Sequence, residues 1–164
     1  MKTLLAFAIW ALLPLQQGEN PDYGYWSSYK SGSWAKLKGE ISDRGVKALM
    51  EVNVTLLELT ADKAVIESKI KMTFNGKVQP EETEKEEILK NKAKYSIKIL
   101  KEGDEEIEVA GKKLQCHWIE GTKEKDKIKY WLAKEVPGAI VKAEISGGDS
   151  TSVVTMSVVA WEKK

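Results

Sequence analysis

The stretch GKKLQCHWIEGTKEKDKIKYWLAKEVPGAIVK, from Gly111 to Lys142, decides the fold class of this chain. Apolar and polar residues alternate in two runs, and a Val-Pro-Gly turn follows the second run. Alternation with a period of two places successive side chains on opposite faces of a strand. The stretch therefore predicts strand, loop, strand, turn and strand.

The same alternation occurs in three earlier runs of the chain, Trp34–Ser42, Val46–Thr60 and Ala64–Phe74. Short turn sequences separate these runs, and Asn75-Gly76 is a strong signal for a tight hairpin turn. The pattern slips by one residue at Leu56-Leu57, which predicts a β-bulge there. Three successive antiparallel strands are the expected result.

Residues 79–94 leave the type of structure open. Their sequence is rich in Glu and Lys, with helical pairs such as Glu81–Lys85 and Glu86–Lys90. A helix here would have little apolar surface with which to dock. We therefore favour an exposed strand or an irregular excursion, with a helix as the close alternative.

Further strand patterns follow, including a hairpin about Ala110-Gly111 and an uncharged final run over Thr151–Trp161. Many short strands and no long amphipathic helix predict an all-β fold. We expect one antiparallel, strongly curved sheet of about 8–10 strands, which rolls into a half-barrel or barrel. This single domain would span residues 34–164, after an irregular lead-in over 19–33 with a helical turn around Tyr25–Tyr29.

The first 18 residues have the pattern of a secretory signal peptide. Lys2 precedes an uncharged apolar run from Leu4 to Leu15, which is too short for a comfortable membrane-spanning helix. We expect cleavage near Gly18, no transmembrane segment afterwards, and a secreted or periplasmic location in a bacterium. A retained N-terminal helix or an uncleaved anchor is the alternative.

The charge balance argues against nucleic acid as a partner. Loss of Lys2 with the signal would bring the formal net charge from +1 to 0. Nucleic-acid-binding domains usually carry a basic excess or stripe. Charged residues of both signs are interspersed and make up 31% of the chain, as on an ordinary solvated surface.

Cys116 and His117 are the only residues of their kinds, and they do not predict a nucleophile and its base. Adjacent residues of a strand point to opposite faces, so Cys116 is expected to be buried beside Trp118. One His and one Cys cannot complete a zinc shell without carboxylates. We predict no catalytic residue, no metal and no cofactor. A hydrolase with carboxylates that pair only in space remains a third, open reading.

Two family resemblances concern carriers of apolar molecules. Gly111-Lys112-Lys113-Leu114-Gln115-Cys116, followed by Trp131 and by Val136-Pro137-Gly138, resembles a pattern in uncharacterised secreted bacterial proteins. Those proteins have a half-barrel similar to the lipoprotein carriers of the LolA/LolB type. Gly32-Ser33-Trp34 more weakly resembles the Gly-x-Trp of lipocalins. Both resemblances imply a β fold that holds a lipid-like ligand in its concavity.

We therefore expect a non-enzymatic protein that binds a lipid or another apolar ligand. The alternative is a domain of the cell envelope with a filled core, whose partner is an envelope protein. The apolar strand faces and the tryptophans supply the expected pocket lining: Trp34, Met50, Val52, Val54, Ile70, Met72, Phe74, Trp118, Trp131, Met156 and Trp161.

Overall fold

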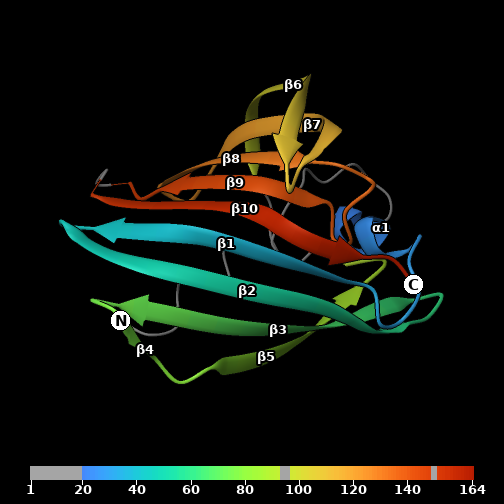
Figure 1. The fold of residues 1–164 in the computed structure, drawn as a ribbon. Helices are drawn as coiled ribbons and strands as arrows, with labels where there is room; N and C mark the ends of the chain where they lie inside the picture. Colours follow the sequence, from blue (N-terminus) through green and yellow to red (C-terminus); the bar gives the residue numbers. More distant parts are fainter. Residues whose placement is uncertain (1–19, 93–96, 149–150) are drawn as a thin grey trace.

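The structure is a computed structural model that describes residues 20–92, 97–148 and 151–164 (Figure 1). The expected signal segment, residues 1–18, lies outside the described residues. The elements in chain order are α1 (Pro21–Trp26), β1 (Trp34–Asp43), β2 (Val46–Leu59), β3 (Lys63–Phe74), β4 (Lys77–Val78), β5 (Glu82–Leu89), β6 (Lys98–Val109), β7 (Lys112–Lys123), β8 (Asp126–Leu132), β9 (Ile140–Ser146) and β10 (Ser152–Glu162).

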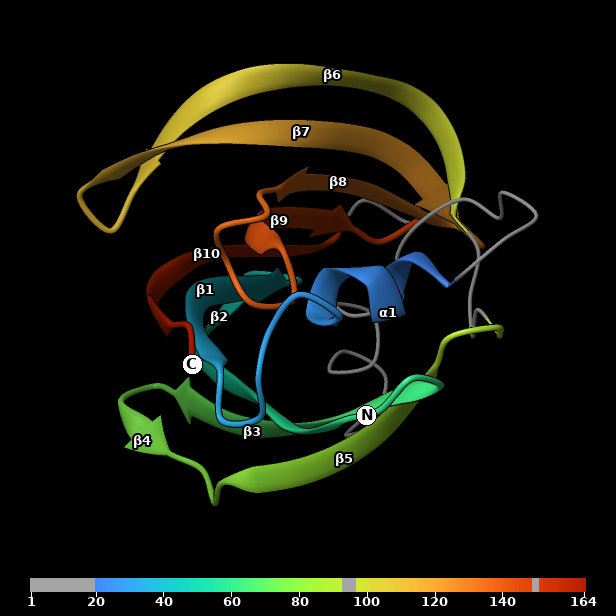
Figure 2. The same ribbon diagram turned by 90° about the vertical axis from the view of Figure 1, so that its right-hand side faces the viewer.

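All ten strands form one antiparallel sheet, in the order β4-β3-β2-β1-β10-β9-β8-β7-β6, with β5 pairing with β3. The strands β1–β4 and β6–β10 pair with their neighbours in the chain as in two meanders, and β1 and β10 join these two halves. The sheet curls around α1 without closing (Figure 2). The prediction of an all-β half-barrel is thus confirmed.

Several local predictions are also confirmed. The register between β2 and β3 shifts between Leu56 and Glu58, where the phase slip predicted a bulge. In the described part of the ambiguous acidic segment, residues 79–92, the chain forms the exposed strand β5 and no helix. The hairpin turn at Ala110-Gly111 has two consecutive positive φ values, 51° and 71°, as a type I′ turn requires.

The short helix lies earlier than the sequence predicted. It spans Pro21–Trp26, whereas the expected turn lay around Tyr25–Tyr29. Asn20 caps it, because the backbone N–H of Asp22 donates to the Asn20 side chain at 3.0 Å. Pro21 then occupies the first turn, where its missing N–H costs nothing. Among the described residues, no helix has the length and apolar character needed to cross a membrane.

The main core lies on the concave face, where side chains of the sheet meet α1. Alternation explains its composition, because every second residue of β2 points inward. We call this set the concave-face cluster. Its buried members are Tyr23, Trp26, Tyr29, Leu37, Ile41, Ala48, Met50, Val52, Val54, Leu56, Ala64, Ile66, Ile70, Ile88, Ile97, Ile119, Ile128, Tyr130, Leu132, Ala139, Ile140, Ala143, Ile145, Val154 and Met156.

A second core lies where the part of the β6–β7 hairpin nearest its turn meets β8, β9 and β10. In Figure 2 this hairpin arches across those strands. We call this set the hairpin cluster. Its buried members are Ala35, Leu114, Cys116, Trp131, Ala133, Val136, Val141 and Val158, with Ile107, Val109, Trp118 and Trp161 packed against them.

Two glycines permit the close packing that the curvature requires. A Cβ at Gly39 in β1 would lie 1.9 Å from the carbonyl oxygen of Thr155 and 2.7 Å from Met156 Cγ. A Cβ at Gly121 in β7 would lie 2.5 Å from the carbonyl oxygen of Lys98. Backbone atoms cannot move aside as a flexible side chain can, so both positions need glycine.

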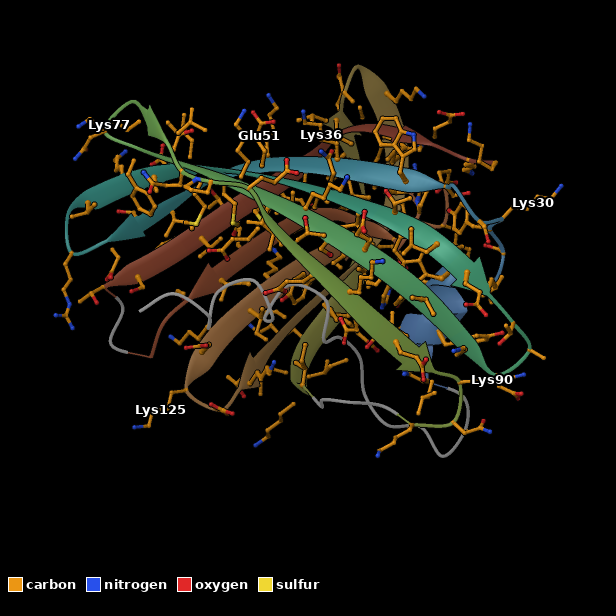
Figure 3. The ribbon with its side chains drawn as sticks, turned by 90° about the horizontal axis from the view of Figure 1, so that it is seen from below. Lys30, Lys36, Glu51, Lys77, Lys90 and Lys125 are labelled. Atoms are coloured by element: carbon orange, nitrogen blue, oxygen red, sulfur yellow. The ribbon has the colours of Figure 1, made fainter. Side chains whose placement is uncertain are left out.

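The convex face carries paired charges across neighbouring strands. The Glu51 carboxylate of β2 lies 2.9 Å from the Lys36 ammonium and 3.0 Å from that of Lys38, both on β1 (Figure 3 labels Glu51 and Lys36). The hydrogen bonds from Lys36 and then Lys38 lower the pKa of Glu51 to about 2. Because water screens this exposed group, its contribution to stability is small.

Substitution of Gly39 by Ala is expected to destabilise the protein by about 2 kcal/mol or more, because the added methyl group overlaps backbone of β10. The free energy of unfolding from urea titrations measures this. Gly24→Ala is the matched control, because a Cβ there meets nothing within 4 Å and Ala favours helix. Equal stability of the two variants would contradict the role given to Gly39.

Candidate functional site

The concave face beneath α1 is the candidate binding site, and three aromatic side chains of the lead-in fill it. Tyr23, Trp26 and Tyr29 are 6%, 1% and 6% exposed. Their spacing of three residues directs them to the same side of a helical turn. They belong to the concave-face cluster, whose other members come from most strands of the sheet. The lead-in therefore acts as an aromatic plug, and we use that name for these three residues.

Hydrogen bonds hold the plug in place. The Tyr23 hydroxyl donates to the carbonyl oxygen of Thr60 at 2.7 Å, and the Tyr29 hydroxyl donates to that of Lys134. The Asn20 side-chain amide donates to the carbonyl oxygens of Leu89 (2.9 Å) and Lys92 (3.0 Å). These bonds tie the plug to the chain near the C-terminal ends of β2, β5 and β8, which lie at the same end of the sheet.

Burial also suppresses ionisation of the tyrosines. It raises the pKa of Tyr29 to about 12, and the charge of Glu135 adds to that rise. Burial raises the pKa of Tyr25 and Tyr130 further, and the carboxylate of Asp22 adds to both effects. These phenols are therefore neutral at physiological pH, and the concave face presents no charge from them.

Little free space remains beneath α1. The hollow there has a volume of about 10 Å³ and is lined by Asp22, Tyr25, Trp26, Ile88, Leu132, Gly138 and Ile140. That volume holds about one water molecule, whereas pockets for ligands of drug size measure roughly 300–1,000 Å³. We expected a hollow that a ligand could enter, and in this conformation the plug occupies it.

The residues predicted to line a pocket fall into separate groups. Met50, Val52, Val54, Ile70 and Met156 belong to the buried part of the concave-face cluster. Met72 and Phe74 pack against it and are only partly buried. The structure brings these seven together on one face, as the alternation predicted. Their contact with a ligand stays a prediction.

The predicted tryptophans lie elsewhere. Trp118, Trp131 and Trp161 belong to the hairpin cluster. The Lys129 ammonium lies 4.7 Å from the ring centroid of Trp118 and 4.5 Å from that of Trp131. Trp34 instead donates from Nε1 to the Glu162 carboxylate at 3.1 Å. These four side chains do not join the seven apolar residues in one lining.

Sequence reasoning missed the aromatic plug, because the lead-in is rich in Gly, Ser and Pro and reads as irregular. The signal that could have found it is the spacing Tyr23, Trp26 and Tyr29 after the capping pair Asn20-Pro21. Tyr130 was placed on a strand but was not recognised as part of the site. It is fully buried in the same cluster.

A second hollow, of about 310 Å³, lies where β7 and the segment after β8 diverge. Its lining is Asp104, Gln115, Cys116, His117, Leu132, Ala133, Lys134 and Glu135. His117 Nδ1 lies 2.9 Å from Asp104 Oδ1, and Nε2 lies 3.6 Å from a Glu102 oxygen. The His117 ring therefore faces carboxylates and not the thiol of Cys116.

Cys116 has the environment of an inert thiol. It is 2% exposed, and its S–H donates to the carbonyl oxygen of Leu114 at 3.7 Å. Burial first, and then the charges of Glu135 and Glu105, raise its pKa to about 11. Reactive cysteines need the opposite, an accessible and electropositive setting. Among the described residues, no three His, Cys, Asp or Glu side chains come together as a metal site would require.

Comparison with known proteins reveals similarity at the level of three-dimensional structure. No protein-family model matches the sequence, and no curated protein matches it. Similar solved structures include MucB in complex with MucA(peri), with a TM-score of 0.46 and 9% identity over 87% of this chain and 56% of that one. The chain thus spans a little over half the length of the MucB chain.

A candidate outer membrane lipoprotein-sorting protein domain from Vibrio parahaemolyticus is also similar, with a TM-score of 0.39 and 9% identity over 88% of this chain and 90% of that one. A DUF1329 family protein from Desulfovibrio piger has a TM-score of 0.27 and 9% identity, over 88% of this chain and 92% of that one. The expected resemblance to lipoprotein-carrier-type half-barrels is found among these structures. At such identities the likeness concerns the fold alone.

Iodoacetamide is expected to leave Cys116 unmodified in the folded protein at pH 8 and to alkylate it fully in concentrated urea. The reason is that the thiolate reacts, and a pKa of about 11 leaves little of it until the pH approaches that value. Intact mass after timed quenching measures the modification. Rapid alkylation of the native protein would show that Cys116 is not held as described.

Proposed function

We propose that this chain is an exported, non-enzymatic module that holds a lipid-like ligand against the concave face of its sheet. The aromatic plug occupies the ligand's place when the ligand is absent. One observation carries the proposal: the curved sheet presents an apolar concave face, and a helix of only six residues with its flanking turn packs against that face. A concave apolar surface in a half-barrel is a common site for apolar ligands.

The size of the plug indicates the size of the ligand. Burial of a large apolar side chain contributes about 1.5–3 kcal/mol, so withdrawal of three rings costs roughly 5–9 kcal/mol. A ligand that displaces them must return a comparable free energy. Each buried methylene group contributes about 0.8 kcal/mol. A chain of roughly ten methylenes is needed, and the acyl chains of membrane lipids and long-chain fatty acids are at least that long.

Withdrawal of the plug would open the concave face, whose inward residues were already predicted from the sequence. They are Met50, Val52, Val54, Ile70, Met72, Phe74 and Met156. Their side chains are flexible or branched hydrocarbons without charge, and methionine adapts to irregular apolar shapes. We propose these seven as the ligand contacts. The tryptophans of the hairpin cluster and Trp34 are proposed no longer as lining but as packing and surface groups.

Trp26→Ala is expected to increase uptake of a long-chain fluorescent fatty acid at least severalfold, because the substitution removes the most deeply buried ring of the plug. It should also lower the free energy of unfolding by about 3–5 kcal/mol. Titration of the probe at a temperature where the variant is folded measures the uptake. Extraction of the purified wild-type protein with organic solvent tests for lipid that is already bound.

Trp34→Ala is the matched control, because Trp34 lies on the surface and bonds only to Glu162 among the hydrogen bonds described for it. Its probe uptake should equal that of the wild type. If Trp26→Ala folds and takes up no more probe than Trp34→Ala, and no lipid is extracted, the carrier proposal fails.

A specific observation favours a second candidate, an envelope domain with a filled core that works by binding a protein. The hollow beneath α1 measures about 10 Å³, and the plug is hydrogen-bonded at both ends. Under this candidate the plug never leaves, and the concave face contributes only to stability. The outcome of the Trp26 experiment separates the two candidates.

Export is expected to remove the first residues of the chain. The support is the sequence pattern alone, with Lys2 ahead of an apolar run. When the full chain is expressed in a Gram-negative host, the periplasmic fraction should contain a protein whose intact mass matches a chain that starts near Glu19. Leu12→Arg should keep the full-length chain in the cell interior, because a charge interrupts the apolar run. Recovery of uncleaved wild-type protein in the cytosol would refute export.

A further inference from the structure

One edge of the open sheet has an unusual distribution of charge. β6 ends the strand order and, among the described residues, pairs only with β7. Its outer edge therefore presents backbone N–H and C=O groups that can pair with another extended segment. Natural edge strands are commonly protected by charged side chains, especially Lys, by Pro, by β-bulges or by short length. β6 has 12 residues, contains no Pro, and has no Lys after position 101.

Acidic side chains occupy one face of the second half of this strand. Glu102, Asp104, Glu106 and Glu108 alternate along it, so they share a face. All four are exposed; the side chains of Glu102 and Asp104 are 61% and 82% exposed. Few partners are described for them: Lys113 and Gln115 contact Glu106, and His117 contacts Glu102 and Asp104. The face remains net negative.

The opposite face of the same half is apolar over its last two positions. Ile107 and Val109 are half-buried and pack against the hairpin cluster. Glu105, also on this side, accepts a hydrogen bond from Trp131 Nε1. Residues directly opposite one another on paired strands interact most strongly when charges are opposite or when both are apolar. The edge therefore favours a strand that alternates basic and apolar residues.

We propose that residues 102–109 of β6 form a docking edge for an extended peptide segment in which basic and apolar side chains alternate. The peptide backbone adds to the sheet as an eleventh strand, its Lys or Arg side chains lie beside the four carboxylates, and its apolar side chains extend the row of Ile107 and Val109. This inference does not depend on the apolar ligand. If the protein is instead an envelope domain with a filled core, the peptide segment is the kind of partner that it would bind.

Charge also excludes a second copy of this chain as the occupant. Two β6 edges would place acidic residues opposite acidic residues, which is destabilising. The other edge strand, β5, is also mostly acidic, with Glu82, Glu84, Glu86 and Glu87 and a single lysine. The acidic edges thus prevent pairing between copies while they permit pairing with a basic strand.

The test uses a blocked peptide with three Lys-Val repeats and two matched peptides. In one, Glu replaces every Lys; in the other, the side chains are unchanged and every backbone nitrogen is methylated. Calorimetry should detect binding of the first peptide, with affinity lower by about tenfold or more for each of the others. Hydrogen exchange should slow within residues 98–109 and not within 82–89. Equal binding of the methylated peptide would mean adsorption by charge alone and would overturn the proposal.

Charge reversal locates the site on the protein. Glu102→Lys with Asp104→Lys is expected to weaken binding by about tenfold, because attraction becomes repulsion at two positions. Glu81→Lys with Glu82→Lys is the control, since it changes the net charge equally at the exposed start of β5. An equal loss of affinity in both double variants would overturn the assignment to β6, whatever the outcome for the apolar ligand.

Discussion

The structure depends on covering one continuous apolar face of an open, curved sheet. A closed barrel buries its inner face by itself, but this sheet does not close and needs another element for that purpose. The chain uses Tyr23, Trp26 and Tyr29, whose rings are large enough to reach across the concavity. The curvature, the glycines at close strand contacts and the hydrogen bonds of the lead-in all serve this one contact.

The same contact links the fold to the question of function. A surface that needs a cover can exchange one cover for another at modest cost, because apolar contacts are not directional. A plug built from a single short helix is a smaller cover than a second sheet. Under the proposed function, the plug and the ligand would alternate on one surface, and burial of three rings would set the free-energy difference between the two states.

Strand positions and faces could be predicted from the sequence, because side-chain alternation is a local property. The inward row of β2 and the type I′ turn at Ala110-Gly111 are examples. The cover could not be predicted, since it brings Trp26 to the same hollow as Ile88 and Ile140, which are far from it in the chain. The separation of Trp118 and Trp131 from the concave face also required the path of the β6–β7 hairpin. Alternation assigns each side chain to one face of its strand, but it does not determine the path of a twisted hairpin in space.

The pairing of β1 with β10 brings residues at the two ends of the described chain into contact. Within the described residues, strand pairing joins the two halves of the sheet only there, so completion of the sheet requires contacts between distant parts of the sequence and should be slow. The last strand must leave the ribosome before the sheet can be completed, and until then the nascent chain stays incompletely folded. In that incompletely folded state, the nascent chain could pass through a translocation channel that accepts only unfolded polypeptide.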